Sequence, residues 1–468
     1  MTRGIVAALL AIASLAAFGQ NQSDINAVIT GGEGRPRIAV PDFRGAGGAQ
    51  AWMGAFNSTL WSELAGSGAL RMVDKSYYPV NIPQQPSDFR SAGGALSSGG
   101  GASPSGTSTL KDWSNPPASA THLAFGYAAV QNDQLVVRGY LFNLGVPDPA
   151  GAQLVAKIYF GPLNADGAKK TAREFAADIL ASLGVKGLEG TRIYFVSDRS
   201  GHKEIWSMDH DGSNQRQITR HGSITQLPAI SPDGKWLAYS TLFKRPGSPI
   251  ESWNIIIQST VTGEKARFTN PDAPTNGWPD FGPNGRFLFA SSLTRSTEIY
   301  TSSIEGGDLR PLTHSRSIDF SPRVNPKTGA DVVFISDRSG KQQLWRMNID
   351  GGDTEMLTNA RGEVANPAWR ADGQMIAFAW TQGFELGGFN IFMMDVANRK
   401  PIQLTKDSGV NENPWWAPDN LHIVYSSKRG NARNSSTQIY TMTADGQNAR
   451  KLTSEGNNMQ PVWVSGVQ

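Results

Sequence analysis

The second half of the chain repeats one sequence unit six times, and this repeat constrains the fold more than any other feature. An apolar residue followed by threonine recurs at Ile218-Thr219, Phe268-Thr269, Leu312-Thr313, Leu357-Thr358, Leu404-Thr405 and Leu452-Thr453, with steps of 50, 44, 45, 47 and 48 residues. A proline before a short apolar segment recurs at Pro228, Pro279, Pro322, Pro367, Pro414 and Pro461. A regular period of this length predicts a repeat architecture.

Each unit has the pattern of four short strands. Turn dipeptides follow most of the proline segments, as at Asp233-Gly234, Asn284-Gly285 and Asp372-Gly373, and they supply the positive φ of a tight hairpin. Short apolar segments such as IYFVS from 193 and VVFIS from 332 follow as further strands. Because a single four-stranded sheet leaves apolar faces uncovered, the units must stack. The pattern predicts a six-bladed β-propeller over residues 191–468.

The frame of the repeats also predicts how the ring closes. The first copy begins at its second strand, Arg192 to Ser197, whereas a proline strand, Pro461 to Val464, is left over at the end of the chain. We expect this last strand to complete the first blade. A sheet shared in this way adds backbone hydrogen bonds between the first and last blades.

Residues 36–186 carry no such repeat and alternate between helical and strand patterns. Strands are expected at 37–43, 69–74, 122–128, 134–142 and 152–160, one helix face at Trp52, Phe56, Leu60 and Leu64, and another at Phe175, Ile179 and Leu183. This order predicts a small α/β domain with a mixed sheet. The Gly/Ser/Ala-rich segment 91–108 has almost nothing to bury and is expected to be a flexible loop.

The first 19 residues have the pattern of a secretory signal peptide. Arg3 precedes an apolar run from Ile5 to Ala17, and Gly19 provides a small residue for cleavage, which we expect within about three residues of it. The run is shorter than the roughly 20 residues that span a bilayer. We therefore expect a soluble protein with no direct membrane insertion.

Composition excludes several classes of function. The net charge is only +3 and no long Lys/Arg run occurs, so nucleic acid is not an expected partner. The chain has no cysteine, which excludes thiolate metal sites and cysteine nucleophiles. It also lacks G-x-S-x-G, H-E-x-x-H and Walker motifs, so no catalytic residue, metal ligand or cofactor is predicted, although a cation in the channel stays open. The repeated SDRSG at 197–201 and 336–340 is interpreted as a turn, with Asp198 and Asp337 accepting local backbone hydrogen bonds.

The remaining candidate site is the mouth of the propeller channel. The segments before the six prolines are expected to link the outer strand of one blade to the inner strand of the next, and to meet at one mouth. The candidate contact residues there are Gln226, Leu227, Asn276, Gly277, Trp278, Asp319, Phe320, Asn366, Asn411, Glu412, Asn413, Asn458 and Gln460. Trp278 and Phe320 are predicted interface anchors, unless they fold back over the blade.

Three motifs together resemble the TolB family, the periplasmic component of the Tol-Pal system. They are R-P-R-I-A-V-P-D-F at 35–43, T-R-I-Y-F-V-S-D-R at 191–199 and S-P-D-G-x-x-L-A-Y at 231–239, and the resemblance covers essentially the whole mature chain. It implies a monomeric, non-enzymatic periplasmic adaptor that binds Pal, the peptidoglycan-associated lipoprotein, at the channel mouth. It also implies that a segment within residues 20–35 binds TolA, through Asp24, Ile25, Val28, Ile29 and Thr30.

A different class of function competes with the adaptor. A secreted hydrolase or a carbohydrate-binding propeller would use the same channel. A carboxylate-rich channel floor with strongly shifted pKa values would favour that class, whereas an apolar rim with a mobile N-terminal strand would favour the adaptor.

Overall fold

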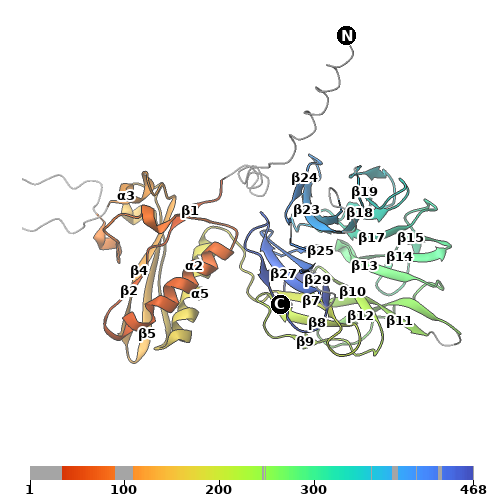
Figure 1. Ribbon diagram of the computed structural model, residues 1–468, viewed down its shortest axis with the longest axis horizontal. Helices are drawn as coiled ribbons and strands as arrows, with labels where there is room; N and C mark the ends of the chain where they lie inside the picture. Colours follow the sequence, from red (N-terminus) through yellow and green to blue (C-terminus); the bar gives the residue numbers. More distant parts are fainter. Residues whose placement is uncertain are drawn as a thin grey trace, which may run out of the picture.

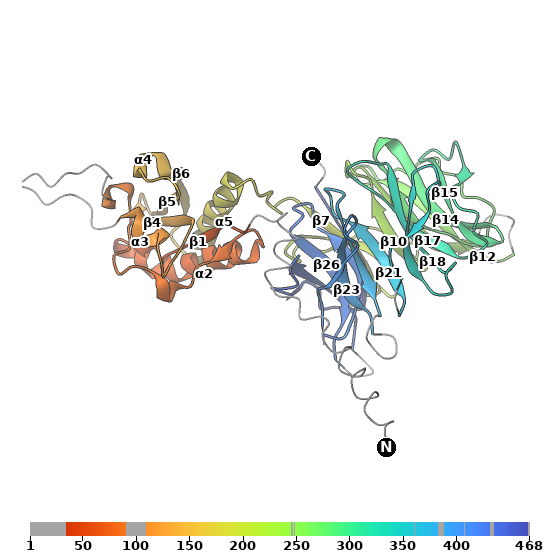
Figure 2. The ribbon, with the colours of Figure 1, turned by 90° about the horizontal axis from the view of Figure 1, so that it is seen from above.

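The computed structural model describes residues 34–89, 109–244, 247, 249–359, 361–381, 388–406, 408–430 and 435–466. An N-terminal α/β domain and a β-propeller lie side by side (Figures 1 and 2). The predicted signal peptide, the predicted TolA-binding residues and the Gly/Ser-rich segment 91–108 lie outside the described residues.

The N-terminal domain is built on one mixed sheet, as predicted. Its strand order is β3 (Arg71–Met72), β1 (Arg37–Ala39), β4 (His122–Gln131), β5 (Gln134–Asn143) and β6 (Gln153–Pro162), with β2 (Arg44–Gly45) beside β4. β1 runs parallel to both of its neighbours, whereas β4, β5 and β6 form an antiparallel meander. The turn between β4 and β5 uses Asn132 and Asp133 at φ of 52° and 57°, which is the geometry that a two-residue hairpin turn requires.

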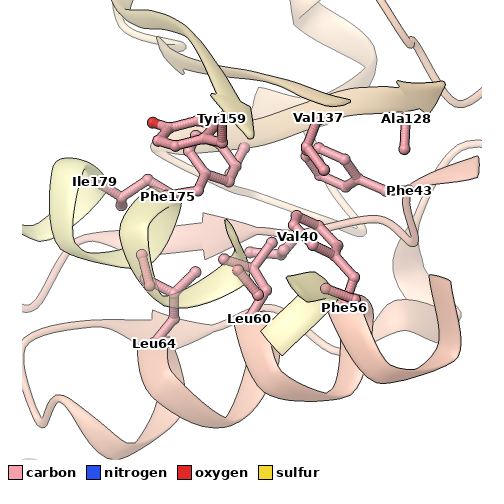
Figure 3. Packing of buried hydrophobic residues seen from close by; sticks show 14 of the residues in the cluster. Val40, Phe43, Phe56, Leu60, Leu64, Ala128, Val137, Tyr159, Phe175 and Ile179 are labelled. Carbon is pink, nitrogen blue, oxygen red and sulfur yellow. The ribbon is translucent and has the colours of Figure 1, made fainter. Parts of the chain in front are cut away.

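Two long helices cover one face of this sheet. α2 (Met53–Gly66) buries Phe56, Leu60 and Leu64, and α5 (Ala165–Ser182) buries Phe175 and Ile179 against them (Figure 3). The short helix α3 (Leu110–Ser114) contributes to a second apolar cluster with the other face of β4 and β5. The remaining short helices are η1 (Gly47–Trp52), η2 (Lys75–Tyr77), η3 (Pro86–Asp88) and α4 (Pro149–Ala152).

Six antiparallel blades form the propeller. The inner strands are β10 (Thr225–Ile230), β13 (Asn276–Phe281), β17 (Asp319–Val324), β21 (Val364–Trp369), β25 (Val410–Trp416) and β29 (Asn458–Val464). The second strands are β11 (Trp236–Lys244), β14 (Arg286–Thr294), β18 (Asp331–Ser336), β22 (Met375–Trp380), β26 (His422–Lys428) and β7 (Arg192–Ser197). The third strands are β12 (Glu251–Ser259), β15 (Ser296–Ser303), β19 (Gln343–Asn348), β23 (Asn390–Asp395), β27 (Gln438–Thr443) and β8 (Glu204–Asp209). Short outer strands follow in five blades, namely β16 (Arg310–Pro311), β20 (Glu355–Met356), β24 (Pro401–Gln403), β28 (Arg450–Lys451) and β9 (Arg216–Gln217).

The C-terminal strand closes the ring as predicted. β29 pairs antiparallel with β7, so that Asn458 lies opposite Ser197 and Trp463 lies opposite Ile193. The resulting sheet has the order β29-β7-β8-β9. The first and last parts of the propeller sequence therefore share one set of backbone hydrogen bonds.

The repeated threonine has a structural reason that recurs from blade to blade. The hydroxyl of Thr219 accepts a hydrogen bond from the backbone N–H of Ile205 in the third strand, at 2.8 Å, and donates one to Glu204. Equivalent bonds to a third-strand N–H occur at Thr313, Thr358, Thr405 and Thr453. The threonine thus ties the outer segment of a blade to its third strand where the backbone ladder ends.

One blade departs from this scheme. The sheet β10-β11-β12 has three strands, and its outer segment is attached by an isolated bridge between Gln258 and Lys265. There the side-chain oxygen of Asn270, one residue after the repeat threonine, accepts the hydrogen bond from the backbone N–H of Ile255 at 2.7 Å. An asparagine therefore takes the place of the threonine hydroxyl.

The two domains meet where α2 ends. The Nε2 atom of His422 in β26 lies 2.6 Å from the backbone oxygen of Gly66, and its Nδ1 atom lies 2.6 Å from the carboxylate of Asp419. Arg35 forms an ion pair of 3.0 Å with Asp445 in the same blade. Because both partners of His422 are acceptors, this contact favours the doubly protonated imidazolium, and hydrogen bonding to Asp419 raises its pKa despite burial.

Candidate functional site

Each of the six inner strands is interrupted at the repeat proline. The pairing with the second strand shifts between Gln226 and Ala229 in β10, and at the equivalent places in the other five blades. A proline has no N–H for the ladder, so a strand carries it most easily at an irregularity of this kind. The repeated proline therefore marks a bulge inside the strand.

The residue before each proline has a left-handed backbone. These residues, which we call the channel ring, are Leu227, Trp278, Ser321, Asn366, Asn413 and Gln460, with φ between 52° and 57°. All six line one open cavity where the inner strands of the blades meet. Positive φ is costly for large side chains such as those of Leu227 and Trp278, and such backbone strain concentrates at functional sites. The bulge thus gives every blade one side chain at the channel.

The structure arranges the two predicted anchor residues, Trp278 and Phe320, differently from the sequence interpretation. Trp278 belongs to the channel ring, whereas Phe320 lies one position earlier in its blade and Ser321 takes the ring position. The two rings pack against each other, with centroids 5.2 Å apart. Both side chains are half-buried. Trp278 and Phe320 therefore form one aromatic pair at the channel and not two separate anchors.

The predicted contact residues do not lie in links between blades. All thirteen lie within the inner strands, because the pairing of these strands starts three or four residues before the proline. Four of them, Asn276, Asp319, Asn411 and Asn458, are fully buried. Their side chains bond within the fold, as when Asn458 donates to Gln438 at 2.9 Å. The prediction that these segments are loops was wrong, because the strands extend past the bulge on both sides.

Two blades that are not neighbours contact each other at the cavity. Arg323 of β17 places its guanidinium 5.0 Å from the ring centroid of Trp415 in β25, across the blade that contains β21. Trp415 in turn donates from Nε1 to the backbone oxygen of Trp463 at 3.1 Å. Sequence reasoning missed Arg323 and Trp415, although both follow a repeat proline directly. Their place directly after the repeat proline was the signal that could have identified them as lining residues.

Two carboxyl groups near the channel have raised pKa values. Burial raises the pKa of Asp280 to about 6, against the opposing effect of Arg323, whose Nη1 lies 3.3 Å from Oδ1 of Asp280. Burial also raises the pKa of Glu412, for which no charged partner contributes. Among the described residues that line the cavity, neither carboxylate is present and Arg323 is the only charged one. Arg323 brings a positive charge to this lining, and Asp280 carries the negative charge of its ion pair.

A search of the described ranges for clusters of metal-binding side chains gives a negative result. Those ranges contain no group of three His, Asp or Glu side chains that could hold a metal ion. Nor is any of the described helices long and apolar enough to cross a membrane. The chemistry that this channel offers is recognition by an aromatic pair, polar ring side chains and one arginine.

The SDRSG turns have a larger role than predicted. Asp198 accepts hydrogen bonds from the backbone N and the Nδ2 of Asn457, at 2.7 and 2.8 Å. Asp337 accepts one from the backbone N–H of Ile318 at 2.8 Å. The expectation of local bonds was wrong, because each aspartate reaches across to the residue that precedes the inner strand of its own blade.

Fold and channel define the protein as a six-bladed β-propeller with an N-terminal α/β domain and a cavity lined by its inner strands. The family model described as "TolB beta propeller domain" matches residues 181–382 and 351–467. The chain belongs to the TolB family.

Individual relatives agree with this assignment. The chain is 29% identical over 438 residues to a protein TolB homolog of Chlorobium luteolum, covering 92% of this chain and 91% of the relative. It is 33% identical over 217 residues to a protein TolB homolog of Chlorobium chlorochromatii, 46% of each chain. The crystal structure of TolB from Acinetobacter baumannii is similar with a TM-score of 0.63 and 21% identity, covering 92% of this chain and 97% of that one, which supports the fold.

Proposed function

We propose that this protein is a non-enzymatic periplasmic adaptor of the Tol-Pal envelope system. It binds the peptidoglycan-associated lipoprotein Pal at the channel mouth and TolA through its N-terminal segment, and so supports outer-membrane integrity and constriction during cell division. Membership of the TolB family supports the assignment to the Tol-Pal system, and the signal-peptide pattern of residues 1–19 supports a location in the periplasm.

The channel ring carries the proposal for the Pal site. Six blades each direct one side chain to a single cavity, and the half-buried pair of Trp278 and Phe320 stands beside it. Large aromatic side chains next to a pocket are typical of the few residues that carry most of the binding energy of an interface. Of the thirteen predicted contact residues, the four that are fully buried do not belong to this proposed surface.

The alternative of a hydrolase or a carbohydrate-binding propeller receives no comparable support. Hydrolysis of a glycosidic bond generally uses two carboxyl groups facing the substrate. The described residues that line the cavity include no carboxylate, and Asp280 directs both oxygens to Arg323 and the backbone N–H of Val324.

Direct binding tests the proposal. The mature chain and the folded domain of Pal from the same genome are mixed and analysed by sedimentation velocity, in parallel with the C-terminal domain of TolA. The adaptor predicts a complex with each partner. If the chain sediments as it does alone in the presence of Pal, the proposal for the channel mouth fails.

A further inference from the structure

The channel ring and its surroundings are apolar on one side only. Leu227 and Trp278 are the ring residues of the blades that contain β10 and β13. In the next blade the ring residue is a serine, but Phe320 directly before it packs on Trp278. The ring residues of the other three blades are polar, namely Asn366, Asn413 and Gln460. Because the blades follow one another around the propeller in chain order, the blades of β10, β13 and β17 are neighbours, and we call them the apolar half.

Exposed apolar side chains extend the apolar half away from the cavity. Strands alternate in direction within a blade, so the starts of the inner and third strands and the ends of the second strands share one end of the propeller. Four large apolar residues with exposed fractions between 40% and 62% lie at that end, namely Ile224 before β10, Ile250 before β12, Leu293 near the end of β14 and Ile318 before β17. The aromatic pair lies near the starts of its own inner strands, at this same end.

Backbone contacts fix this placement. The backbone oxygen of Ile224 accepts a hydrogen bond from the N–H of Leu242 in β11, at 3.0 Å. In the next blade the N–H of Ser292, the neighbour of Leu293, donates to the oxygen of Thr275, which directly precedes β13. The exposed residues therefore stand beside the starts of the inner strands that carry the channel ring.

The other half of this end is charged. Among the described residues of the blades that contain β21, β25 and β29, no large apolar side chain is exposed. The exposed side chains at their end near the inner-strand starts include those of Glu363, Lys428, Arg429 and Glu455. Protein interfaces typically have an apolar centre and a polar border. This end of the propeller offers both, side by side.

Continuity with the cavity separates these residues from ordinary surface residues. Singly exposed apolar residues are common and need no explanation. Val261 and Leu309 are of that kind, because they lie in turns at the opposite end, after β12 and before β16. The four residues of the apolar half instead continue an aromatic pair beside a cavity, and such continuity is typical of a docking surface.

We infer that the docked protein rests off-centre on the propeller, with an apolar patch of its own over the apolar half, and leaves most of the charged half uncovered. The inference rests on the proposed function for the identity of the docked protein. Ile224, Leu293 and Ile318 then add buried apolar area to that of the aromatic pair, whereas a partner centred on the channel would contact all six blades alike.

Titration calorimetry with the Pal domain tests the inference through serine variants. Ile224→Ser, Leu293→Ser and Ile318→Ser each remove an exposed apolar side chain, so the fold should be kept while the dissociation constant rises about fivefold or more. Val261→Ser and Leu309→Ser are the matched controls, because they remove exposed apolar side chains from two of the same blades at the opposite end. Their affinity should stay within about twofold of the wild type.

The outcomes separate the inference from the proposed function. Melting curves establish that every variant is folded. If Pal binds the wild type and all three variants of the apolar half with equal affinity, the inference is overturned while the proposed function stands. If Pal does not bind the wild type, the proposed function fails and the inference fails with it.

Hydrogen exchange maps the footprint without any substitution. With Pal bound, the backbone amides around Ile224, Leu293 and Ile318 should exchange more slowly than in the free protein, whereas those around Glu363 and Glu455 should change little. Slower exchange of equal size in all six blades would overturn the off-centre footprint and leave the proposed function intact.

Discussion

Asp198, in the first turn of the propeller, accepts two hydrogen bonds from Asn457, which lies 259 residues later in the chain. Both bonds connect the beginning of the propeller sequence to its end. They act beside the backbone pairing of β29 with β7, where Asn458 lies opposite Ser197. The closure of the ring thus depends on a side chain as well as on a shared sheet.

Removing the closing strand should damage the whole propeller. Deletion of residues 458–468 exposes apolar faces of the first blade and leaves a strand edge unpaired, so we expect unfolding to lose its cooperativity or the melting temperature to fall sharply. Asp198→Ala should lower the free energy of unfolding by about 1 kcal/mol, since it leaves two half-buried donors of Asn457 without their acceptor. Differential scanning calorimetry measures both, and a deletion variant that melts like the full chain would show that this strand does not close the ring.

The contact between domains should weaken at high pH. His422 is buried and has a pKa raised above its ordinary value of 6.5, with hydrogen bonds to Asp419 and Gly66 favouring the charged form. Its stabilising contribution is therefore complete below pH 6.5 and is lost as the pH rises through the raised pKa. Melting temperatures from pH 6 to 9 should fall more for the wild type than for His422→Gln. The exposed His202→Gln serves as the control and should follow the wild type; parallel curves for all three proteins would contradict this role of His422.

Asp280 should also make stability fall as the pH rises, but over a more acidic range than His422 does. Its pKa in the folded protein is about 6, raised chiefly by burial from 3.8. The folded protein then binds a proton more tightly than the unfolded chain between these values, so stability falls as the pH rises from about 4 to about 6, by up to about 3 kcal/mol. Asp280→Asn should remove this slope in urea unfolding measured at each pH. A slope that persists in the variant would assign it to another group.

The N-terminal segment should be needed for one partner and not for the fold. Removing residues 20–34 takes away no residue of the described apolar clusters, so we expect the melting temperature to stay nearly unchanged while TolA binding is lost. Pal binding should be retained, which provides the internal control. Retained TolA binding would place that site elsewhere on the chain.

The fold was predictable because its signals are local and repeated. The proline marks a bulge in all six units, and the threonine marks a hydrogen bond in five of them, so several weak signals reinforce one another. Closure by Pro461 to Val464 followed from the frame of the repeats alone. The sequence could not reveal that the strand continues on both sides of the proline, because the left-handed backbone at Trp278 or Leu227 has no marker in residue type.

The site was less predictable because its contacts join distant parts of the chain. Arg323 meets Trp415 across an intervening blade, and Asp198 meets Asn457 across the whole propeller. His422 meets the end of a helix in the other domain, 356 residues away. None of these partners can be inferred from spacing, since each depends on how whole blades and domains are placed.

The aromatic pair at the channel gives the most direct test of the account. Titration calorimetry of the Pal domain against the wild type, Trp278→Ala and Phe320→Ala should show a loss of about 2 kcal/mol or more, roughly 30-fold in dissociation constant, for each variant. Asn413→Ala, a polar change in the same channel ring, should cost less than about 1 kcal/mol. Equal dissociation constants for the wild type and both aromatic variants, with all proteins folded, would contradict the claim that Pal binds at the channel mouth.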